Sequence, residues 1–281
     1  MSAVALAPRP ARRRRRRTIA GGVGPIGLGV ATLWLSVIVL LPLAAVFAKA
    51  LEDGPKALWD AATAGPALAA LQLTVSISVI VALINVVTGT LIAWVLVRDD
   101  FRGKSFVNAL IDLPFALPTI VASIVLLSLY GPRSPDGLHH FATKPAVIIA
   151  LLFVTLPFVV RSVQPVLMEA DREAEQAAAS LGAGNWTIFR RIVLPALVPT
   201  LLSGAGLAFA RALGEYGSVV LIGGGIPHDT EVSSQYIAKQ VETDRATAAA
   251  AVSVSLLLVA FAVLVLLRLV AKRSMRHEVT G

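Results

Sequence analysis

Two ionisable residues, Arg211 and Glu215, lie inside a long apolar stretch that runs from about Leu197 to Ile222. Their spacing of four residues puts them on one face of a helix, where the two side chains can pair. An ionisable residue inside a membrane-spanning helix is costly, so it usually marks a transport pathway or a buried pair. Because an Arg–Glu pair is neutral overall and offers an anion little attraction, we favour a neutral pair at a subunit interface over a gate or an anion-steering site.

The other residues that could do chemistry are scattered. No Ser/His pair, paired Asp or His cluster lies at membrane depth, where an intramembrane protease or lipid transferase would need it. The chain also lacks the Gly-x-x-x-x-Gly-Lys-Ser/Thr loop that binds ATP phosphates. The four histidines lie in loops or at the C-terminal tail, and none pairs with a second ligand at metal spacing. We therefore expect no enzyme, with no catalytic residue, no metal site and no cofactor bound by this chain.

Composition predicts a membrane protein. Of the 281 residues, 56% are hydrophobic and only 15% are charged, whereas soluble domains carry about 25% charged residues. Cysteine is absent, which excludes disulfides and thiolate metal sites. The net charge of +8 lies in the short segments beside the apolar stretches, so it indicates membrane topology rather than binding of nucleic acid.

Several uncharged stretches reach the roughly 20 residues that a bilayer-spanning helix needs. We predict an all-α protein with six transmembrane helices, at about 26–48, 67–97, 107–130, 145–163, 197–222 and 247–267. The first apolar stretch follows the basic run Arg12–Arg17 and is longer than the roughly 7–15 residues of the apolar core of a signal peptide, so we expect a retained helix. The basic run could contact anionic lipid, or it could only hold the N-terminus inside the cell.

The basic residues also predict the orientation. With six spans and the N-terminus inside, 18 of the 25 Lys and Arg residues fall in cytoplasmic segments and six fall outside. This excess agrees with the positive-inside rule and puts both termini in the cytoplasm. We accordingly expect a basic cytoplasmic tail at 1–25, a transmembrane domain at 26–268 and a cytoplasmic tail at 269–281.

The longest cytoplasmic loop, at 164–195, has a helical pattern of its own. Glu169–Leu181 is rich in Ala, Glu and Gln, which favour helix, and Gly182 with Gly184 would end that helix. Asn185 could cap a second short helix that runs to Val193, before Pro195 leads into the fifth span. The pattern fits a compact knob on the cytoplasmic face as well as an amphipathic hairpin lying on the inner leaflet.

Part of this loop resembles a known sequence pattern. Gln176-Ala177-Ala178, then Gly182, then Ile192-Val193-Leu194-Pro195 is similar to the cytoplasmic loop of ABC-importer permeases. The family pattern is Glu-Ala-Ala, three residues, Gly, nine residues and Ile-x-Leu-Pro, and Gln176 replaces its Glu. The resemblance implies a loop that couples to an ATPase, with Phe189 and Ile192 as anchors. The coupling residues it implies are Glu173, Glu175, Gln176, Ala177, Ala178, Gly182, Phe189, Ile192, Leu194 and Pro195.

Two further segments narrow the resemblance. The segments are Asp112–Thr119, which contains Pro114 and Pro118, and Phe209–Val220, which contains Tyr216 and Ser218. Both resemble the T-type membrane subunit of the bacterial sulfate/thiosulfate importer, whose W-type sister has Phe after its Gly-Glu pair. The prolines could kink a helix near the pathway or serve only packing. The pathway or subunit-interface candidates are Arg211, Glu215, Tyr216, Ser218, Pro114 and Pro118.

The resemblance implies an ABC-importer permease fold of the type shared with methionine and molybdate permeases. It also implies a multi-pass protein of the bacterial inner membrane that forms the pathway for sulfate or thiosulfate, with molybdate or phosphate as alternative substrates. The implied partners are two ATPase subunits that use ATP and Mg, a sister W-type permease and an extracytoplasmic sulfate-binding protein. The glycine run Gly223–Gly225 could form an outer gate loop where the binding protein docks, or a plain connection.

Overall fold

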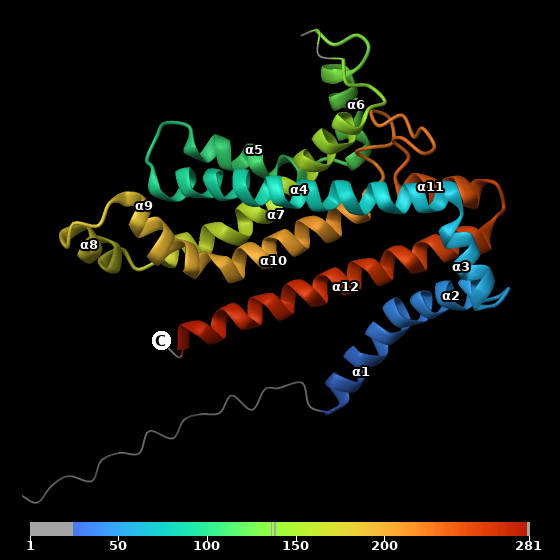
Figure 1. The fold of residues 1–281 in the computed structure, drawn as a ribbon, viewed down its shortest axis with the longest axis horizontal. Helices are drawn as coiled ribbons and strands as arrows, with labels where there is room; N and C mark the ends of the chain where they lie inside the picture. The colour runs from blue at the N-terminus through green and yellow to red at the C-terminus, as the bar shows by residue number, and fades with distance from the viewer. Residues whose placement is uncertain (1–24, 136, 138, 280–281) are drawn as a thin grey trace, which may run out of the picture. The chain divides into compact units, whose positions relative to one another are not determined.

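The computed structural model describes residues 25–135, 137 and 139–279, with side chains from 27 to 271. The basic run Arg12–Arg17 therefore lies outside the described residues. All regular elements of the described part are helices, as predicted (Figure 1). The chain divides into two units, residues 1–45 and residues 46–281.

The described part of the first unit is a single apolar rod. It contains α1 (Pro25–Leu35), a π turn (Ser36–Leu40) and the start of α2 (Leu41–Ala50). The span from Gly27 to Ala50 is long and apolar enough to cross a membrane, which confirms the first predicted span. Pro42 has no N–H to donate to Ile38, and the turn before it widens so that the Leu41 N–H bonds Ser36 O instead.

Four long helices form the body of the second unit. They are α4 (Gly65–Arg98), α7 (Lys144–Glu169), α10 (Leu194–Leu213) and α12 (Ala246–Val279). In Figure 1 they lie side by side, with the short helix α3 (Pro55–Thr63) beside the start of α4. Each long helix contains a candidate membrane span, so the predicted second, fourth, fifth and sixth spans all correspond to helices. α12 continues as helix through the predicted tail as far as Val279.

Small and polar residues join these helices. A Cβ on Gly89 of α4 would lie 3.0 Å from Val159 of α7, and one on Gly204 of α10 would lie 3.2 Å from Ser162. The Asn85 amide donates a 2.8 Å hydrogen bond to the hydroxyl of Thr155, which is fully buried. Helices that share an apolar solvent with lipid associate through such close backbone approach and buried polar contacts.

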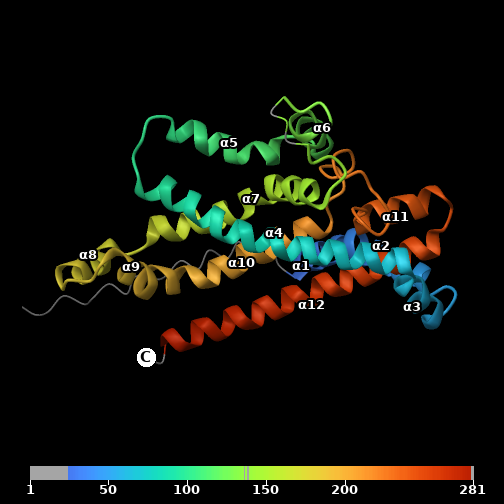
Figure 2. The same cartoon turned by 45° about the horizontal axis from the view of Figure 1, so that its top comes forward.

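The third predicted span, 107–130, is broken rather than continuous. It consists of α5 (Lys104–Ala116) and α6 (Thr119–Tyr130), whose axes differ by 114° (Figure 2). Pro118 disfavours helical geometry at Leu117, which is extended at φ −86° and ψ 135°. The structure therefore has five candidate spans, or six if α5 and α6 count as one, and the prediction of one helix here was wrong.

The fifth predicted span, 197–222, also ends too late. α10 stops at Leu213, Gly214 follows as its C-terminal cap residue, and residues 214–232 form successive turns. α11 (Ser233–Glu242) then leads toward α12. The prediction extended the helix because residues 216–222 are mostly apolar, whereas their apolar side chains pack as turns against α6 and α7.

Candidate functional site

The loop predicted to couple to an ATPase forms two short helices, α8 (Arg172–Ser180) and α9 (Asn185–Ile188). α8 begins later than the predicted Glu169, because Ala170 leaves helical geometry and the Asp171 carboxylate caps the Glu173 N–H at 2.8 Å. After α8, Gly182 adopts a φ of +86°. Its N–H bonds Ala179 O and the next N–H bonds Ala178 O, so the chain turns tightly at Gly182.

The second short helix differs from the prediction at its start. The cap residue is Gly184, and Asn185 is the first helical residue, without a side-chain cap hydrogen bond. The Asn185 side chain instead lines an apolar hollow of about 340 Å³ together with Trp94 and Trp186. Asn185 therefore does not act as the predicted cap.

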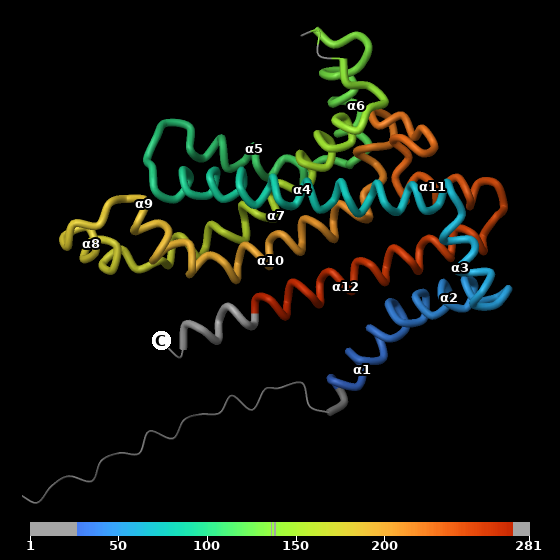
Figure 3. The backbone as a smooth tube through the Cα atoms, in the orientation of Figure 1, coloured from blue at the N-terminus to red at the C-terminus, as the bar shows by residue number. Residues whose placement is uncertain are grey.

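Pro195 does not separate the loop from the fifth span. α9, a π turn (Phe189–Val193) and α10 form one uninterrupted helical rod from Asn185 to Leu213 (Figure 3). The Leu194 N–H bonds Phe189 O, because the π turn before Pro195 accommodates the missing donor without a break. A displacement of α9 can thus reach α10 directly.

The surface of this loop is largely open. Glu173, Gln176 and Ala177 are exposed, while Ala178, Ile192, Leu194 and Pro195 are half-buried. Two large apolar side chains project from it, Leu181 at 89% exposure and Trp186 at 70%. Either the inner membrane surface or another protein could cover these two side chains.

Phe189 contacts this chain's own aromatic residues. Its ring packs edge-on against Trp94 of α4 at 5.5 Å and stacks on Trp186 at 5.7 Å. The predicted anchor therefore fastens the loop to the transmembrane body of this chain.

An ion pair makes the second attachment of the loop. The Arg98 guanidinium at the end of α4 lies 2.5 Å from the carboxylate of Glu175 on α8, and both side chains are more than four-fifths buried. Arg98 also lies over the ring of Trp94 at 5.1 Å. A cavity of about 150 Å³ beside Glu175 is lined by residues of α7, α8, the π turn and α10. The sequence did not predict this pair: Arg98 is one of the 18 basic residues of the predicted cytoplasmic segments, and no local signal links it to Glu175, which is far away in the chain.

This ion pair yields a testable prediction. Glu175→Gln should reduce transport severalfold, because α8 loses its charged attachment to α4 while the chain still inserts. The matched control is Glu169→Gln, the same change at an exposed side chain at the end of α7, just before α8. Uptake normalised to the amount of protein should separate the two, and a double-mutant cycle with Arg98→Gln should give a coupling of about 0.5–3 kcal/mol. Equal uptake by the two single variants would exclude this role.

The second group of candidate residues surrounds Glu215. The carboxylate of Glu215 forms an ion pair with Arg211 and accepts a 2.7 Å hydrogen bond from the Ser218 N–H. The Glu215 side chain is 1% exposed, whereas that of Arg211 is 34% exposed. Because α10 ends between them, the two residues do not share one helix face as predicted. The pair forms across the helix end, where the carboxylate also holds the following turn.

The two sequence segments that carried the sulfate resemblance meet here. A Cβ on Gly217 would lie 2.1 Å from the Thr119 hydroxyl oxygen at the start of α6, so only glycine fits between Tyr216 and Ser218. The Ser123 hydroxyl accepts hydrogen bonds from the N–H groups of Leu221 and Ile222. Pro118 matters because its break sets where α6 begins, while Pro114 lies within α5, away from this contact in the chain.

The contact is lined with buried hydroxyl groups. The Thr74 hydroxyl of α4 accepts a 2.8 Å hydrogen bond from the Ser233 N–H, and Ser234 donates one to Glu215 O. Within the described part, the buried hydroxyls of Ser78, Ser218 and Ser233 have no hydrogen-bond partner. Unpaired buried polar groups are costly, so they tend to occur where a ligand, water or a second conformation supplies the partner.

A polar cluster that the sequence did not reveal ties α5 to α7. The Arg161 guanidinium makes a forked contact with Asp112, at 2.7 and 2.5 Å, and also bonds Asn108 and Gln164. In the sequence, Arg161 is one of the 18 basic residues of the predicted cytoplasmic segments, and Asp112 begins the segment Asp112–Thr119. The spacing of Asn108 and Asp112, one helical turn apart, was the available signal.

Glu231 lies two residues before the start of the short helix α11 and is buried, at 4% exposure. Its carboxylate is 3.7 Å from the Lys239 ammonium. Burial, reinforced by the charge of Glu231, raises the pKa of the Tyr236 phenol above its ordinary value of 10.0. Tyr236 therefore stays neutral at physiological pH and acts as a packing residue against α4.

Comparison with known proteins identifies the family. Residues 85–276 match the family described as the inner membrane component of binding-protein-dependent transport systems. The chain belongs to this family. It is thus a multi-pass component of an inner membrane importer that works with a binding protein, and ATP hydrolysis is carried out by separate subunits.

Individual relatives extend the match over most of the chain. The chain is 39% identical over 255 residues to the sulfate transport system permease protein CysT of Synechocystis sp., covering 88% of this chain and 89% of that protein. It is 41% identical over 219 residues to the protein of the same description from Salmonella typhimurium, covering 75% and 79%.

Solved structures agree on the fold. A bacterial ABC transporter involved in the import of the acidic polysaccharide alginate has a chain with a TM-score of 0.71 and 16% identity, covering 88% of this chain and 94% of that one. The MetNI methionine ABC transporter gives a TM-score of 0.59 at 18% identity, covering 73% and 94%. The prediction of an ABC-importer permease fold is confirmed.

Proposed function

We propose that this chain is a permease subunit that forms the pathway for sulfate, and for thiosulfate, in an ATP-driven importer. The observation that carries the proposal is the identity of about 40% to sulfate transport permeases over most of both chains. The chemistry of the buried site fits an anion path, since it contains hydroxyl groups without hydrogen-bond partners among the described residues and its one buried carboxylate is neutralised by a guanidinium. Hydroxyl and N–H donors can replace the water around a tetrahedral oxyanion without fixing it by a net charge.

The path would run past the turn at 214–218. Here Arg211 neutralises the buried carboxylate of Glu215, and the small residues Gly217 and Ser218 lie against the start of α6. Opening would separate this turn from α6 and expose the hydroxyls of Ser78, Ser218 and Ser233 to the substrate. Pro118 contributes by making α6 a separate short helix that can move against α5.

The cytoplasmic loop would bind the ATPase. The exposed face of α8, with Gln176, Ala177 and Leu181, would dock on that partner. Phe189 and the Arg98–Glu175 pair would transmit the movement of the loop to α4. The rod from Asn185 to Leu213 ends two residues before Glu215, so a shift of the loop arrives at the proposed gate. Coupling of this kind is rigid-body motion of packed helices.

The assembly would contain this chain, a sister W-type permease, two ATPase subunits that use ATP and Mg, and an extracytoplasmic sulfate-binding protein. Support for a sister chain comes from the exposed apolar faces of α4 and α12, which a second membrane subunit or lipid must cover. The binding protein would dock near the turns at 223–232.

Uptake of labelled sulfate tests the substrate. The chain, expressed with its partner subunits in a strain without a sulfate importer, should restore uptake that excess unlabelled sulfate or thiosulfate suppresses. Unlabelled molybdate is the critical control competitor, because it is a tetrahedral dianion like sulfate. Suppression by molybdate or phosphate at lower concentrations than by sulfate would assign the importer to that oxyanion instead.

The proposed topology places both termini in the cytoplasm, with residues 1–25 and 269–281 as cytoplasmic tails. It can be tested in the same strain. The support is the 18-to-6 distribution of basic residues about the spans. Since the chain has no native cysteine, single cysteines at Gly281 and at Lys56 should behave oppositely toward an impermeant thiol reagent. Labelling at position 281 in intact cells would overturn the topology.

A further inference from the structure

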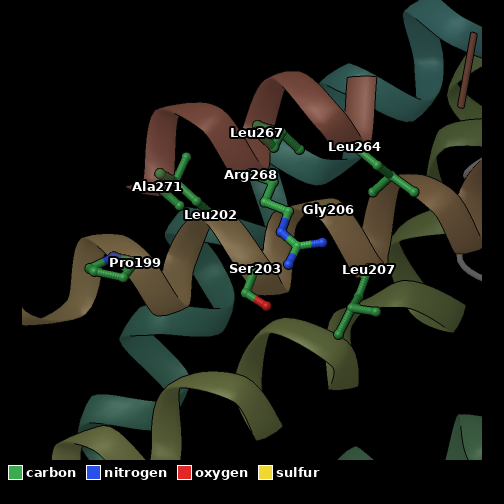
Figure 4. A pocket seen from close by; sticks show the side chains of 9 residues that line it. All are labelled: Pro199, Leu202, Ser203, Gly206, Leu207, Leu264, Leu267, Arg268 and Ala271. Carbon is green, nitrogen blue, oxygen red and sulfur yellow. The ribbon is translucent and has the colours of Figure 1, made fainter. Parts of the chain in front are cut away.

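An apolar groove between α10 and α12 contains a single cation. The groove encloses about 320 Å³, and its walls include Leu202, Leu207, Leu264 and Leu267. Figure 4 shows the Arg268 side chain reaching from α12 toward α10, with its guanidinium near Ser203 and Gly206. Arg268 is the one charged residue among the groove's lining residues, and no ion pair of Arg268 occurs in the described part of the chain.

The position of Arg268 along α12 fixes its depth in the membrane. Residues 246–267 before it carry no charge, and at 1.5 Å per residue they span about 33 Å, close to the roughly 30 Å hydrocarbon core. Arg268 therefore lies at the level of the lipid headgroups while the groove runs into the acyl-chain region. Arg245 precedes the same stretch and lies at the opposite headgroup layer.

The C-terminal half of α12 points toward the end of the bundle where α8 and α9 lie (Figure 1). In the proposed function this end of the bundle faces the ATPase. The assignment of the groove to the inner leaflet therefore rests on the proposed function. Lys272, Arg273 and Arg276 follow in the sequence, and basic clusters at the inner end of a span attract anionic lipid.

We propose that this groove binds one anionic glycerophospholipid of the inner leaflet, with its phosphate on Arg268 and an acyl chain between α10 and α12. The guanidinium supplies paired donors that match phosphate oxygens. Gly206 forms the floor, because a Cβ there would approach Leu264 and Leu267 to 3.3 and 3.4 Å. A lipid in this position fastens α10, the helix that carries the loop's displacement, to α12.

The test uses the complex with its partner subunits in phosphatidylcholine nanodiscs that contain a trace of photoactivatable phosphatidylglycerol. Crosslinked peptides should map to 199–207 and 264–271, with at least about fivefold more label than from photoactivatable phosphatidylcholine, as expected for about 1 kcal/mol from one basic residue at the surface. Arg268→Gln should lower the label about fivefold, and Arg268→Lys should keep most of it. Arg245→Gln, the matched change at the other end of α12, should have no effect.

Several outcomes overturn the proposal. They are equal labelling by the two lipids, label spread evenly along α12, and unchanged labelling in Arg268→Gln. Displacement of the label by excess inorganic phosphate would assign Arg268 to a free anion instead. Crosslinking of a photoreactive amino acid at position 203 to the second membrane subunit would show that a protein covers the groove. None of these readouts depends on transport, so failure here leaves the sulfate proposal standing, and loss of sulfate uptake leaves the lipid site standing.

Discussion

Arg211→Leu is expected to reduce the amount of assembled permease more than any other single change near the proposed gate. It strands the carboxylate of Glu215, whose side chain is 1% exposed and which then keeps only the Ser218 N–H. Breaking a buried pair by removing one partner costs on the order of 3–5 kcal/mol. Glu215→Leu should be milder, because the Arg211 side chain is 34% exposed and can turn toward water or lipid phosphate.

The double variant separates pairing from anion contact. Arg211→Leu with Glu215→Leu strands no charge, so the protein level in the membrane should recover in part whichever role Arg211 has. Sulfate uptake per molecule should also recover if the pair only neutralises itself, and we expect this outcome. Recovery of the protein level without recovery of uptake would instead place Arg211 in contact with the anion. A double variant as poorly assembled as Arg211→Leu would remove the pair from the explanation altogether.

Gly182→Trp should abolish transport while leaving the subunit in the membrane. The φ of Gly182 is +86°, and a Cβ there would meet no atom within 4 Å. The expected damage therefore has two sources, backbone strain of about 1–2 kcal/mol in the left-handed region and an indole placed on the proposed docking face. Both act on the tight turn that orients α8 against α9.

Three further variants distinguish these sources. Gly182→Val carries the strain without the bulk, while Gly182→Asn tolerates the left-handed conformation and should transport almost normally. Gly184→Trp places the same bulk two residues away at a φ of −71°, without the strain. Uptake per molecule measures all of them, and near-normal uptake by Gly182→Trp would exclude a mechanical role for the loop.

The fold was predictable because long apolar stretches separated by charged segments indicate membrane-spanning helices directly. The two misplaced helix ends have different causes. Pro118 signalled a break in the third span, whereas the 114° angle between α5 and α6 has no counterpart in the local sequence. α10 stops at Leu213, and the Glu215 carboxylate accepts a hydrogen bond from the Ser218 N–H in the turn that follows, which the apolar run after it conceals.

The candidate sites divide in the same way. Spacing predicted that Arg211 and Glu215 would pair and that the chain would turn at Gly182, because both are local. The Arg98–Glu175 pair and the Phe189–Trp94 contact join residues that are far apart in the chain, so a single sequence carries no signal for either. The functional roles of all these residues stay predictions until the variants above are measured.

The π turn at 189–193 has a consequence for chimeric permeases. A π turn holds one residue more than the α turn it replaces, so the loss of one residue there can be absorbed by an ordinary α turn without rotating α9. The loss of a second residue would rotate α9 by about 100° about the helix axis and draw it in by about 1.5 Å, and Trp186 would leave the hollow beside Trp94. A cytoplasmic loop exchanged between two permeases can therefore dock with one residue fewer between the glycine turn and Pro195, but not with two fewer.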